Sequence, residues 1–351
     1  MPPSSKFSHR QGEENLAPEE IEARRRAAEV RGELLAPKTR RHAWLNIAGP
    51  LGAVIIAIIL GAFYKNPIGV LRWVQSTELG WSGVTKNEVG LDEGLMTYYI
   101  NGGYPDMEPV VMIHGLGPNA ALVWRDVMGP IGQGHYKVMA PNLYGFADSE
   151  HKQVDHSIAY QAAGIAKFID QMKIDKVNLI GWDIGADVAL YYAVDHPDKV
   201  ERLILVSGGL FGEASANKLR QDLLPTSVEA MQTQAKDSFF DLPPMPGFMY
   251  ERMMEQLSQD SQAETEMLNS IPRDEGHIRS KLGQIFNLLT VITWGGKDPY
   301  FSSRQGNAIH AALPGSATVV FKTSGHYPQL EHPEEFTDSI LFVFKQTEGG
   351  Q

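Results

Sequence analysis

The stretch Lys176-Val-Asn-Leu-Ile-Gly-Trp-Asp183-Ile-Gly185 decides the fold class of this chain. A short apolar run leads into a turn that has glycine two residues before and two residues after Asp183, and a helical pattern, Ala186–Val194, follows at once. A side chain presented on a sharp strand-to-helix turn needs glycines on both sides, because the turn is strained and the helix packs close to the strand. Gly and Asp favour any turn, so the signal lies in the position of the motif between a strand and a helix.

Apolar, strand-like runs recur on both sides of this stretch, with helical patterns between them. Short apolar strands that alternate with helices predict an α/β fold, with a mostly parallel sheet covered by helices on both faces. Ligand sites in such sheets lie beyond the carboxyl ends of the strands, where the motifs described below fall. The predicted strands are Val110–Ile113, Tyr136–Ala140, Lys176–Ile180, Arg202–Val206, Leu289–Trp294 and Thr318–Phe321, and the clearest helices are Ser157–Met172 and Ala186–Val194.

The alternation breaks from about residue 208 to residue 285, where helical patterns occur without a convincing strand. An insertion over the strand ends would form a helical lid. The stretch is rich in methionine, whose flexible side chains suit a lid that accepts varied apolar shapes, although we expect most of them to fill the lid's own core. These residues are Met231, Met245, Met249, Met253, Met254 and Met267.

Two residues complete a catalytic arrangement with Asp183. Asp298 follows a predicted strand in Trp294-Gly-Gly-Lys-Asp, and His326 follows the last one in Ser-Gly-His-Tyr-Pro. The chain order nucleophile, acid, histidine is the order of the α/β-hydrolase fold. Asp298 would hold the imidazole in the required tautomer, and His326 would deprotonate a water molecule.

A glycine-rich loop, His114-Gly115-Leu116-Gly117, follows the first predicted strand. The backbone N–H groups of Leu116 and Ile184 would form an oxyanion hole, that is, a pair of donors aimed at a developing negative oxygen. Further candidates for motif or pocket positions are Trp124 after this loop, Trp182 before Asp183, and Tyr250 in the lid.

The N-terminal part reads as a membrane anchor. The run LNIAGPLGAVIIAIILGAFY, from Leu45 to Tyr64, contains 20 residues without a charge, which is the length of a bilayer-spanning helix. Basic residues are concentrated before it, which predicts a cytoplasmic N-terminus and a C-terminal domain on the opposite, periplasmic or luminal/extracellular, side. The expected organisation is a charged segment (1–44), a transmembrane helix (45–64), a linker (65–85) and the α/β domain (86–348).

Composition limits the other function classes. The net charge of −11 argues against a nucleic-acid partner, because phosphate binding needs clustered Lys and Arg. Cysteine is absent, which excludes disulfides and thiol catalysis. The glycine-rich stretches lack the spacing of a dinucleotide or phosphate-binding loop, and the histidines lack metal-ligand spacing, so we expect neither cofactor nor metal.

From about Trp81 to Lys345 the chain resembles the membrane-associated lipases of the α/β-hydrolase superfamily, which include bacterial cold-adapted lipases and mammalian monoacylglycerol lipases. The resemblance implies an ester- or lipid-cleaving ancestry and a lipophilic substrate. It is carried by His114-Gly-Leu-Gly, Gly145-Phe-Ala-Asp-Ser, the turn at Asp183, Asp195-His-Pro-Asp-Lys-Val, Leu242-Pro-Pro-Met-Pro-Gly, Trp294-Gly-Gly-Lys-Asp and Gly325-His-Tyr-Pro-Gln-Leu-Glu-His-Pro.

The chain departs from that family at Asp183, where the lipases carry serine. A carboxylate at this position looks like the haloalkane dehalogenases and epoxide hydrolases, which attack an sp³ carbon and form an alkyl-enzyme ester. Ile184 stands where dehalogenases usually place a halide-binding tryptophan. Epoxide hydrolases usually use two lid tyrosines, and this lid offers Tyr250.

Three functions therefore stay open on the sequence. The first is hydrolysis of an epoxide or alkyl halide with Asp183 as nucleophile, His326 as base and Asp298 as acid. The second is an ester or lipid hydrolase in which Asp183 activates water directly. The third is a catalytically silent fold that serves as a membrane-tethered binding or complex subunit.

Overall fold

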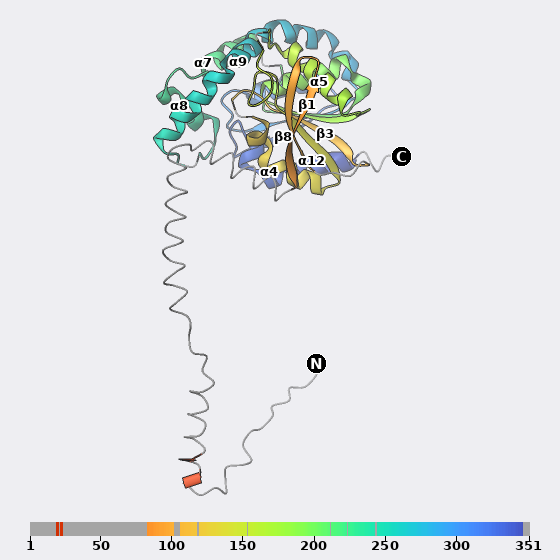
Figure 1. Cartoon of the computed structure of the whole chain (residues 1–351). Helices are drawn as coiled ribbons and strands as arrows, with labels where there is room; N and C mark the ends of the chain where they lie inside the picture. The colour runs from red at the N-terminus through yellow and green to blue at the C-terminus, as the bar shows by residue number, and fades with distance from the viewer. Residues whose placement is uncertain are drawn as a thin grey trace. The chain divides into compact units, whose positions relative to one another are not determined.

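The computed structural model of the 351-residue chain describes residues 19–20, 22–23, 83–101, 106–117, 119–152, 154–210, 212–222, 224–242 and 244–346. The chain divides into two compact units, Met1–Lys65 and Asn66–Gln351. In the first unit, the described residues Glu19, Glu20, Glu22 and Ala23 are helical. The α/β domain belongs to the second unit (Figure 1).

An eight-stranded sheet forms the centre of the α/β domain, in the order β1-β2-β4-β3-β5-β6-β7-β8. The first two strands form an antiparallel hairpin, and β2 pairs antiparallel with β4. All pairs from β4 to β8 are parallel, so their carboxyl ends meet at one edge of the sheet. The strands are Val84–Leu91 (β1), Gly94–Asn101 (β2), Glu108–Ile113 (β3), Tyr136–Pro141 (β4), Val177–Trp182 (β5), Val200–Val206 (β6), Leu289–Gly295 (β7) and Ala317–Phe321 (β8).

Helices cover both faces of this sheet because consecutive strand residues point to opposite faces. On β3, Val110 belongs to the core under α4 and α12, and Val111 belongs to the core under α5, α6 and α10. The sheet helices are Ala120–Gln133 (α4), Ile158–Gln171 (α5), Ile184–Asp195 (α6), Ser303–Ala312 (α10), Pro328–Glu331 (α11) and Pro333–Gln346 (α12), with a 3₁₀ turn at Pro197–Lys199 (η1).

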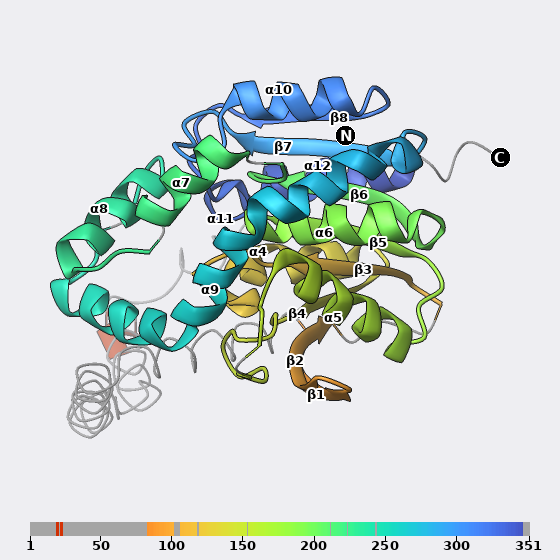
Figure 2. The same ribbon diagram turned by 90° about the horizontal axis from the view of Figure 1, so that it is seen from above.

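The stretch from 208 to 285 is helical, as the sequence predicts. It contains Glu213–Asp222 (α7), Val228–Ser238 (α8), Gly247–Lys281 (α9) and the 3₁₀ turn Leu282–Ile285 (η2). Figure 2 shows α9 returning from α8 across α6, with which it packs. Met231 and Met253 pack in a small cluster between α8 and the start of α9, whereas Met267 lies in the main core. The second half of α9 is therefore part of the domain body, and the lid proper consists of α7, α8 and the first half of α9.

The six predicted strands are all present, with ends that differ by at most two residues. The hairpin β1–β2 was not predicted, because β1 lies at the sheet edge and is largely exposed, so its sequence lacks a continuous apolar run. No helix among the described residues is both long and apolar enough to cross a membrane. The predicted span, residues 45–64, lies outside the described residues.

Arg202 on β6 connects the amino ends of neighbouring strands to the C-terminal helix α12. Its side chain is buried, and its guanidinium donates to Glu108 on β3 at 2.9 Å, to Asn178 on β5 at 2.8 Å and to the carbonyl of Phe344 on α12 at 3.0 Å. Buried acceptors left without such a donor are costly, so one side chain fixes the register of three strands against α12.

We predict that Arg202→Met lowers the free energy of unfolding by roughly 2–4 kcal/mol, because it leaves the Asn178 and Phe344 oxygens buried and unpaired. Chemical denaturation followed by circular dichroism measures this difference. The matched control is Lys176→Met, which removes an exposed ion pair with Glu201 and should cost less than about 1 kcal/mol. Equal losses in the two variants would contradict this account of Arg202.

Candidate active site

Asp183 sits on a strained turn between β5 and α6. Its φ of 55° and ψ of −131° lie in a region that non-glycine residues rarely adopt, and such strain concentrates at functional sites. The turn closes because a Cβ is missing at Gly181 and Gly185. A Cβ at Gly185 would lie 2.3 Å from the carbonyl oxygen of His114, so the glycine lets α6 approach the loop that follows β3.

The backbone also closes around the Asp183 side chain from the neighbouring loops. A Cβ at Gly115 would lie 2.4 Å from Asp183 Oδ2, and one at Gly208 would lie 2.0 Å from the Asp183 carbonyl oxygen. Glycine at both positions is therefore required for the carboxyl group to reach the loop at 114–117. The carboxylate is 1% exposed.

The structure brings Asp298 and His326 together at the ends of β7 and β8. His326 Nδ1 lies 2.9 Å from Asp298 Oδ2. The other oxygen, Oδ1, accepts hydrogen bonds from the backbone N–H groups of Tyr300 and Phe301 at 2.8 and 2.9 Å. Asp298 is thus held in place by its own turn, and it orients the imidazole with Nε2 directed away from it.

The two oxygens of Asp183 have different partners. Oδ2 accepts a hydrogen bond from the backbone N–H of Leu116 at 2.9 Å. Oδ1 lies 3.5 Å from His326 Nε2, which is longer than an ordinary hydrogen bond. Neither of these two atoms has a hydrogen-bond partner among the described residues. Asp183 Oδ1 and His326 Nε2 therefore face each other without a hydrogen bond of ordinary length, and each keeps hydrogen-bonding capacity that Asp298 and Leu116 do not use.

Aromatic rings and two backbone contacts position His326. The rings of Trp182, Tyr300 and Tyr327 have centroids 5.1 to 5.6 Å from the imidazole. Trp182 Nε1 donates to the His326 carbonyl at 2.8 Å, and the His326 N–H donates to the carbonyl of Ser238 on α8 at 2.6 Å. Ser238 of the lid and Trp182, just before the turn at Asp183, together fix the loop that carries the histidine.

His326 is strongly biased toward its protonated form. Burial lowers its pKa, but the charge and hydrogen bond of Asp298, together with the nearby carboxylate of Asp183, outweigh burial and raise the pKa to about 10. At neutral pH the ring is therefore an imidazolium between two carboxylates. Removing the charge of either carboxylate would lower the pKa of His326, and the neutral imidazole could then act as a base.

His114, by contrast, has a structural role in the loop. Burial lowers its pKa to about 4, so the ring is neutral. Nδ1 lies 2.8 Å from the carbonyl of Gly115, and Nε2 accepts a hydrogen bond from the backbone N–H of Leu143. These contacts support the loop that presents Leu116 to Asp183.

A third buried carboxyl group, which was not among the residues predicted from the sequence, reaches this loop from the middle of α9. Glu264 on α9 is 0% exposed, and its Oε1 accepts a hydrogen bond from the backbone N–H of Gly117 at 2.9 Å. Its Oε2 has no hydrogen-bond partner among the described residues. Burial, then the nearby charges of Asp260 and Asp183, raise its pKa to about 8 although the Gly117 contact opposes this. A Glu inside a mostly polar helix carries no signal that distinguishes it from a solvated one.

Asp187 on α6 is a further buried acid that holds the loop after β6. Its Oδ1 accepts a hydrogen bond from the N–H of Leu210 at 2.8 Å. Glu275 on α9 accepts one from the N–H of Gly212 at 2.8 Å. Burial and the neighbouring Glu275 raise the pKa of Asp187 well above its ordinary value. The loop leading into the lid is thus bound by carboxyl groups from two helices.

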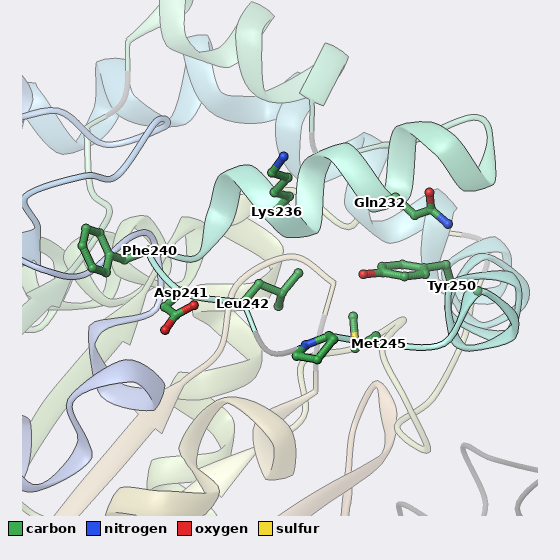
Figure 3. Close-up of a pocket in the computed structure, with 9 residues that line it drawn as sticks. Gln232, Lys236, Phe240, Asp241, Leu242, Met245 and Tyr250 are labelled. Carbon is green, nitrogen blue, oxygen red and sulfur yellow. The ribbon is translucent and has the colours of Figure 1, made fainter.

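Ile184 directly follows Asp183 and is buried at the start of α6. The other candidates, Trp124 and Tyr250, lie apart from this centre, and Trp124 is buried in the core between α4 and the sheet. Tyr250 lines an open pocket of about 590 Å³ between α8, the segment 240–247 and the start of α9, where it packs in the lid cluster (Figure 3). Fourteen residues of α9 separate Tyr250 from Glu264, which corresponds to about 20 Å along the helix axis.

Comparison with known proteins identifies the fold family. The model of the α/β hydrolase fold family matches residues 108–333, which is more than half of the chain. The chain belongs to the α/β hydrolase fold family. Named relatives of this α/β hydrolase are themselves hydrolases, and it is a hydrolase of this fold.

The relatives differ in what their names say. Over 260 residues this α/β hydrolase is 28% identical to an uncharacterized protein of Mycobacterium tuberculosis, covering 68% of this chain and 76% of the relative. Over 275 residues it is 28% identical to a 2-hydroxy-6-oxononadienedioate/2-hydroxy-6-oxononatrienedioate hydrolase of Klebsiella pneumoniae, covering 73% and 94%.

A likeness to solved structures extends over most of the chain. A bacterial membrane phospholipase A superposes with a TM-score of 0.71 at 23% identity, over 86% of this chain and 99% of that one. A 2-hydroxy-6-oxo-6-phenylhexa-2,4-dienoate hydrolase from Rhodococcus sp. superposes with a TM-score of 0.64 at 19% identity, over 75% and 99%. At these identities the likeness shows the fold alone.

We predict that Asp183→Asn lowers the pKa of His326 below 10, because the variant removes one of the two charges that stabilise the imidazolium. The stability that His326 contributes is fully present below its ordinary pKa of 6.5 and is lost as the pH rises through about 10; the upper end of this window should move down in the variant. Nitrogen-detected NMR of the imidazole during a pH titration measures the change. Asp126→Asn, an exposed carboxylate on α4 paired with Arg125, is the control. A His326 pKa that is the same in all three proteins would rule out coupling between the two side chains.

Proposed function

We propose that this hydrolase acts on an electrophilic sp³ carbon, with Asp183 as nucleophile, His326 as base and Asp298 as the acid that orients His326. The hydrogen bond from the Leu116 N–H to Asp183 Oδ2 is the observation that carries this proposal. It leaves Oδ1, which faces His326, as the attacking oxygen. The oxygen that does not attack is then already bound to the donor that an oxyanion hole would supply.

Formation of an alkyl ester at Oδ1 would turn Oδ2 into the ester carbonyl oxygen. When water attacks the carbonyl carbon, negative charge develops on Oδ2, and the Leu116 N–H stabilises it. The second expected donor is the N–H of Ile184, at the first position of α6. The hydrogen bond from Leu116 to Asp183 Oδ2 thus favours hydrolysis of the ester intermediate rather than attack on an acyl substrate.

The electrostatics of His326 fit the same two steps. Esterification removes the charge of Asp183, and with it two of the contributions that raise the pKa of the imidazole. The ring then loses its proton more readily and becomes the base that activates water. A histidine that is protonated before alkylation and neutral after it cannot act prematurely.

The ester-hydrolase alternative conflicts with this arrangement. A substrate carbonyl would need the Leu116 N–H for its own oxygen, but Asp183 already occupies that donor. Direct attack by Asp183 on an ester would also form a reactive anhydride. A silent fold would leave no role for an imidazolium held between two buried carboxylates, since burying charge is costly unless the charge is paired.

We also propose a lipophilic substrate that reaches the enzyme from a membrane to which residues 45–64 anchor the chain, with the N-terminus cytoplasmic and the hydrolase domain on the opposite side. Leu242, Met245 and Tyr250 line the pocket in the lid together with the polar Gln232, Lys236 and Asp241 (Figure 3). Their apolar groups would bind such a substrate at the lid, apart from the catalytic residues. The uncharged 20-residue run supports the anchor.

We predict that a single turnover in ¹⁸O-labelled water places the label in the Asp183 carboxylate, because water attacks the ester carbonyl and not the substrate carbon. Mass spectrometry of the peptide that contains residue 183 detects it. His326→Gln should accumulate the alkyl-Asp183 ester, with hydrolysis slowed by at least about 10²-fold, whereas Asp183→Asn should form no adduct.

Label found in the product but absent from Asp183 would instead support direct attack of water. No turnover and no adduct with epoxides, haloalkanes or esters would favour the silent fold. Asp183→Ser tests the lipase ancestry. If the pocket still accepts esters, this variant should show esterase activity that the wild type lacks.

A further inference from the structure

We propose that Glu264 is the acid that protonates the leaving oxygen, which makes the substrate an epoxide rather than an alkyl halide. This inference rests on the proposed alkyl-enzyme mechanism. The geometry behind it is the loop after β3, whose consecutive N–H groups bind two carboxyl groups. Leu116 donates to Asp183 Oδ2 and Gly117 donates to Glu264 Oε1, both at 2.9 Å.

The two carboxyl groups are therefore neighbours. Consecutive backbone nitrogens are joined through three covalent bonds, so they lie no more than about 4 Å apart. Asp183 enters the site from β5 below, and Glu264 enters from α9 in the lid. Within the proposal, the electrophilic carbon is placed between the two side chains, with Oδ1 of Asp183 on the β5 side and Oε2 of Glu264 on the α9 side.

In-line displacement places the leaving atom opposite the attacking oxygen. His326 Nε2 lies beside the attacking Oδ1, at 3.5 Å, and is thus on the wrong side of the carbon to protonate the leaving atom. Tyr250, the lid acid expected from the sequence, is displaced by about 20 Å along α9 from Glu264. This helical distance removes Tyr250 from the role, and Glu264 takes it.

The free oxygen of Glu264 is suited to hold the proton. Oε1 accepts the hydrogen bond from Gly117, so the acidic proton resides on Oε2, which is buried without a hydrogen-bond partner among the described residues. The carboxyl group is neutral at pH 7, since burial and the charges of Asp260 and Asp183 raise its pKa to about 8. A carboxylic acid of this kind is both available and strong enough to protonate an alkoxide.

The proton count closes over the cycle. Asp183 Oδ1 forms a bond to the epoxide carbon, the ring C–O bond breaks, and its electron pair takes the proton from Glu264 Oε2 to give an alcohol. His326 loses its proton once Asp183 is uncharged, and that proton restores Glu264. His326 then accepts a proton as water attacks the ester carbonyl; the C–O bond to the substrate breaks, and the acid proton of the resulting Asp183 carboxyl passes to the alkoxide. The product is a diol, and the enzyme returns to its starting state.

Glu264 gives a halide leaving group no comparable help. A halide leaves as a stable anion that takes no proton, so the acidic proton of Glu264 does not assist its departure. An oxygen leaving group uses the proton directly. The chemistry of Glu264 therefore selects a strained cyclic ether among the electrophiles that Asp183 could attack.

The test measures ester formation at Asp183 in single turnovers of the full-length protein with 1,2-epoxyoctane and with 1-bromooctane, by mass spectrometry. Glu264→Gln keeps the acceptor for Gly117 but has no acidic proton. We predict that it slows ester formation from the epoxide by at least about 10²-fold, while the rate with the bromide, which needs no proton, changes little. The wild-type epoxide rate should fall as the pH rises through about 8, and Glu264→Gln should lose this dependence.

Asp260→Asn is the matched control, one turn earlier on the same helix. It removes a charge that raises the pKa of Glu264, so the fall in rate should move to lower pH while the low-pH rate is retained. If the wild type forms the ester and Glu264→Gln forms it from the epoxide at an unchanged rate, the role of Glu264 is overturned but the proposed function is not. The same holds if Tyr327→Phe loses the epoxide rate and Glu264→Gln does not. Absence of any ester in the wild type would overturn the proposed function as well.

Discussion

A carboxylate buried at a strained turn is the constraint on which the rest of this structure depends. Asp183 is almost fully enclosed and adopts a positive φ, so its charge needs compensation from neighbouring groups. One oxygen obtains it from a backbone N–H and the other from an imidazolium. The glycines at 115, 185 and 208 are consequences of this arrangement, because any Cβ there would collide with Asp183 or with the backbone beside it.

Backbone hydrogen bonds of the same kind connect α8 and α9 to the loops around Asp183 and His326. The loop that supplies a donor to Asp183 supplies its next donor to Glu264 from α9, and the loop of His326 receives a carbonyl from α8. A displacement of the lid would therefore disturb the nucleophile loop and the histidine loop together. Backbone hydrogen bonds therefore connect α8 and α9 directly to the loops that carry the catalytic residues.

Buried acids accumulate on this side of the domain, and their carboxyl oxygens face two kinds of group, an imidazole and backbone N–H donors. Asp183 faces an imidazolium, Asp187 and Glu275 accept backbone N–H groups of the loop after β6, and Glu264 accepts one from the loop after β3. Burial favours the neutral form of a carboxyl group, and it raises the pKa values of Asp187, Glu264 and Glu275 above their ordinary values. A site of this kind contains a nucleophile and an acid made from the same functional group, distinguished only by their surroundings.

The sequence by itself determined the order of strands and helices, the turn at Asp183 and the succession Asp183, Asp298, His326, because these features depend on local periodicity and on residues at strand ends. It missed the edge hairpin, where alternation with exposed residues removes the apolar run. It predicted Tyr250 as the lid acid and did not point to Glu264, since no local pattern states how far along a helix a side chain lies from a loop that is distant in the chain. Only the tertiary structure decided that Leu116 donates to Asp183, that the imidazole lies between two carboxylates, and that Glu264 reaches the same loop. These facts depend on packing between segments up to about 150 residues apart, and the charge state of each acid follows from that packing.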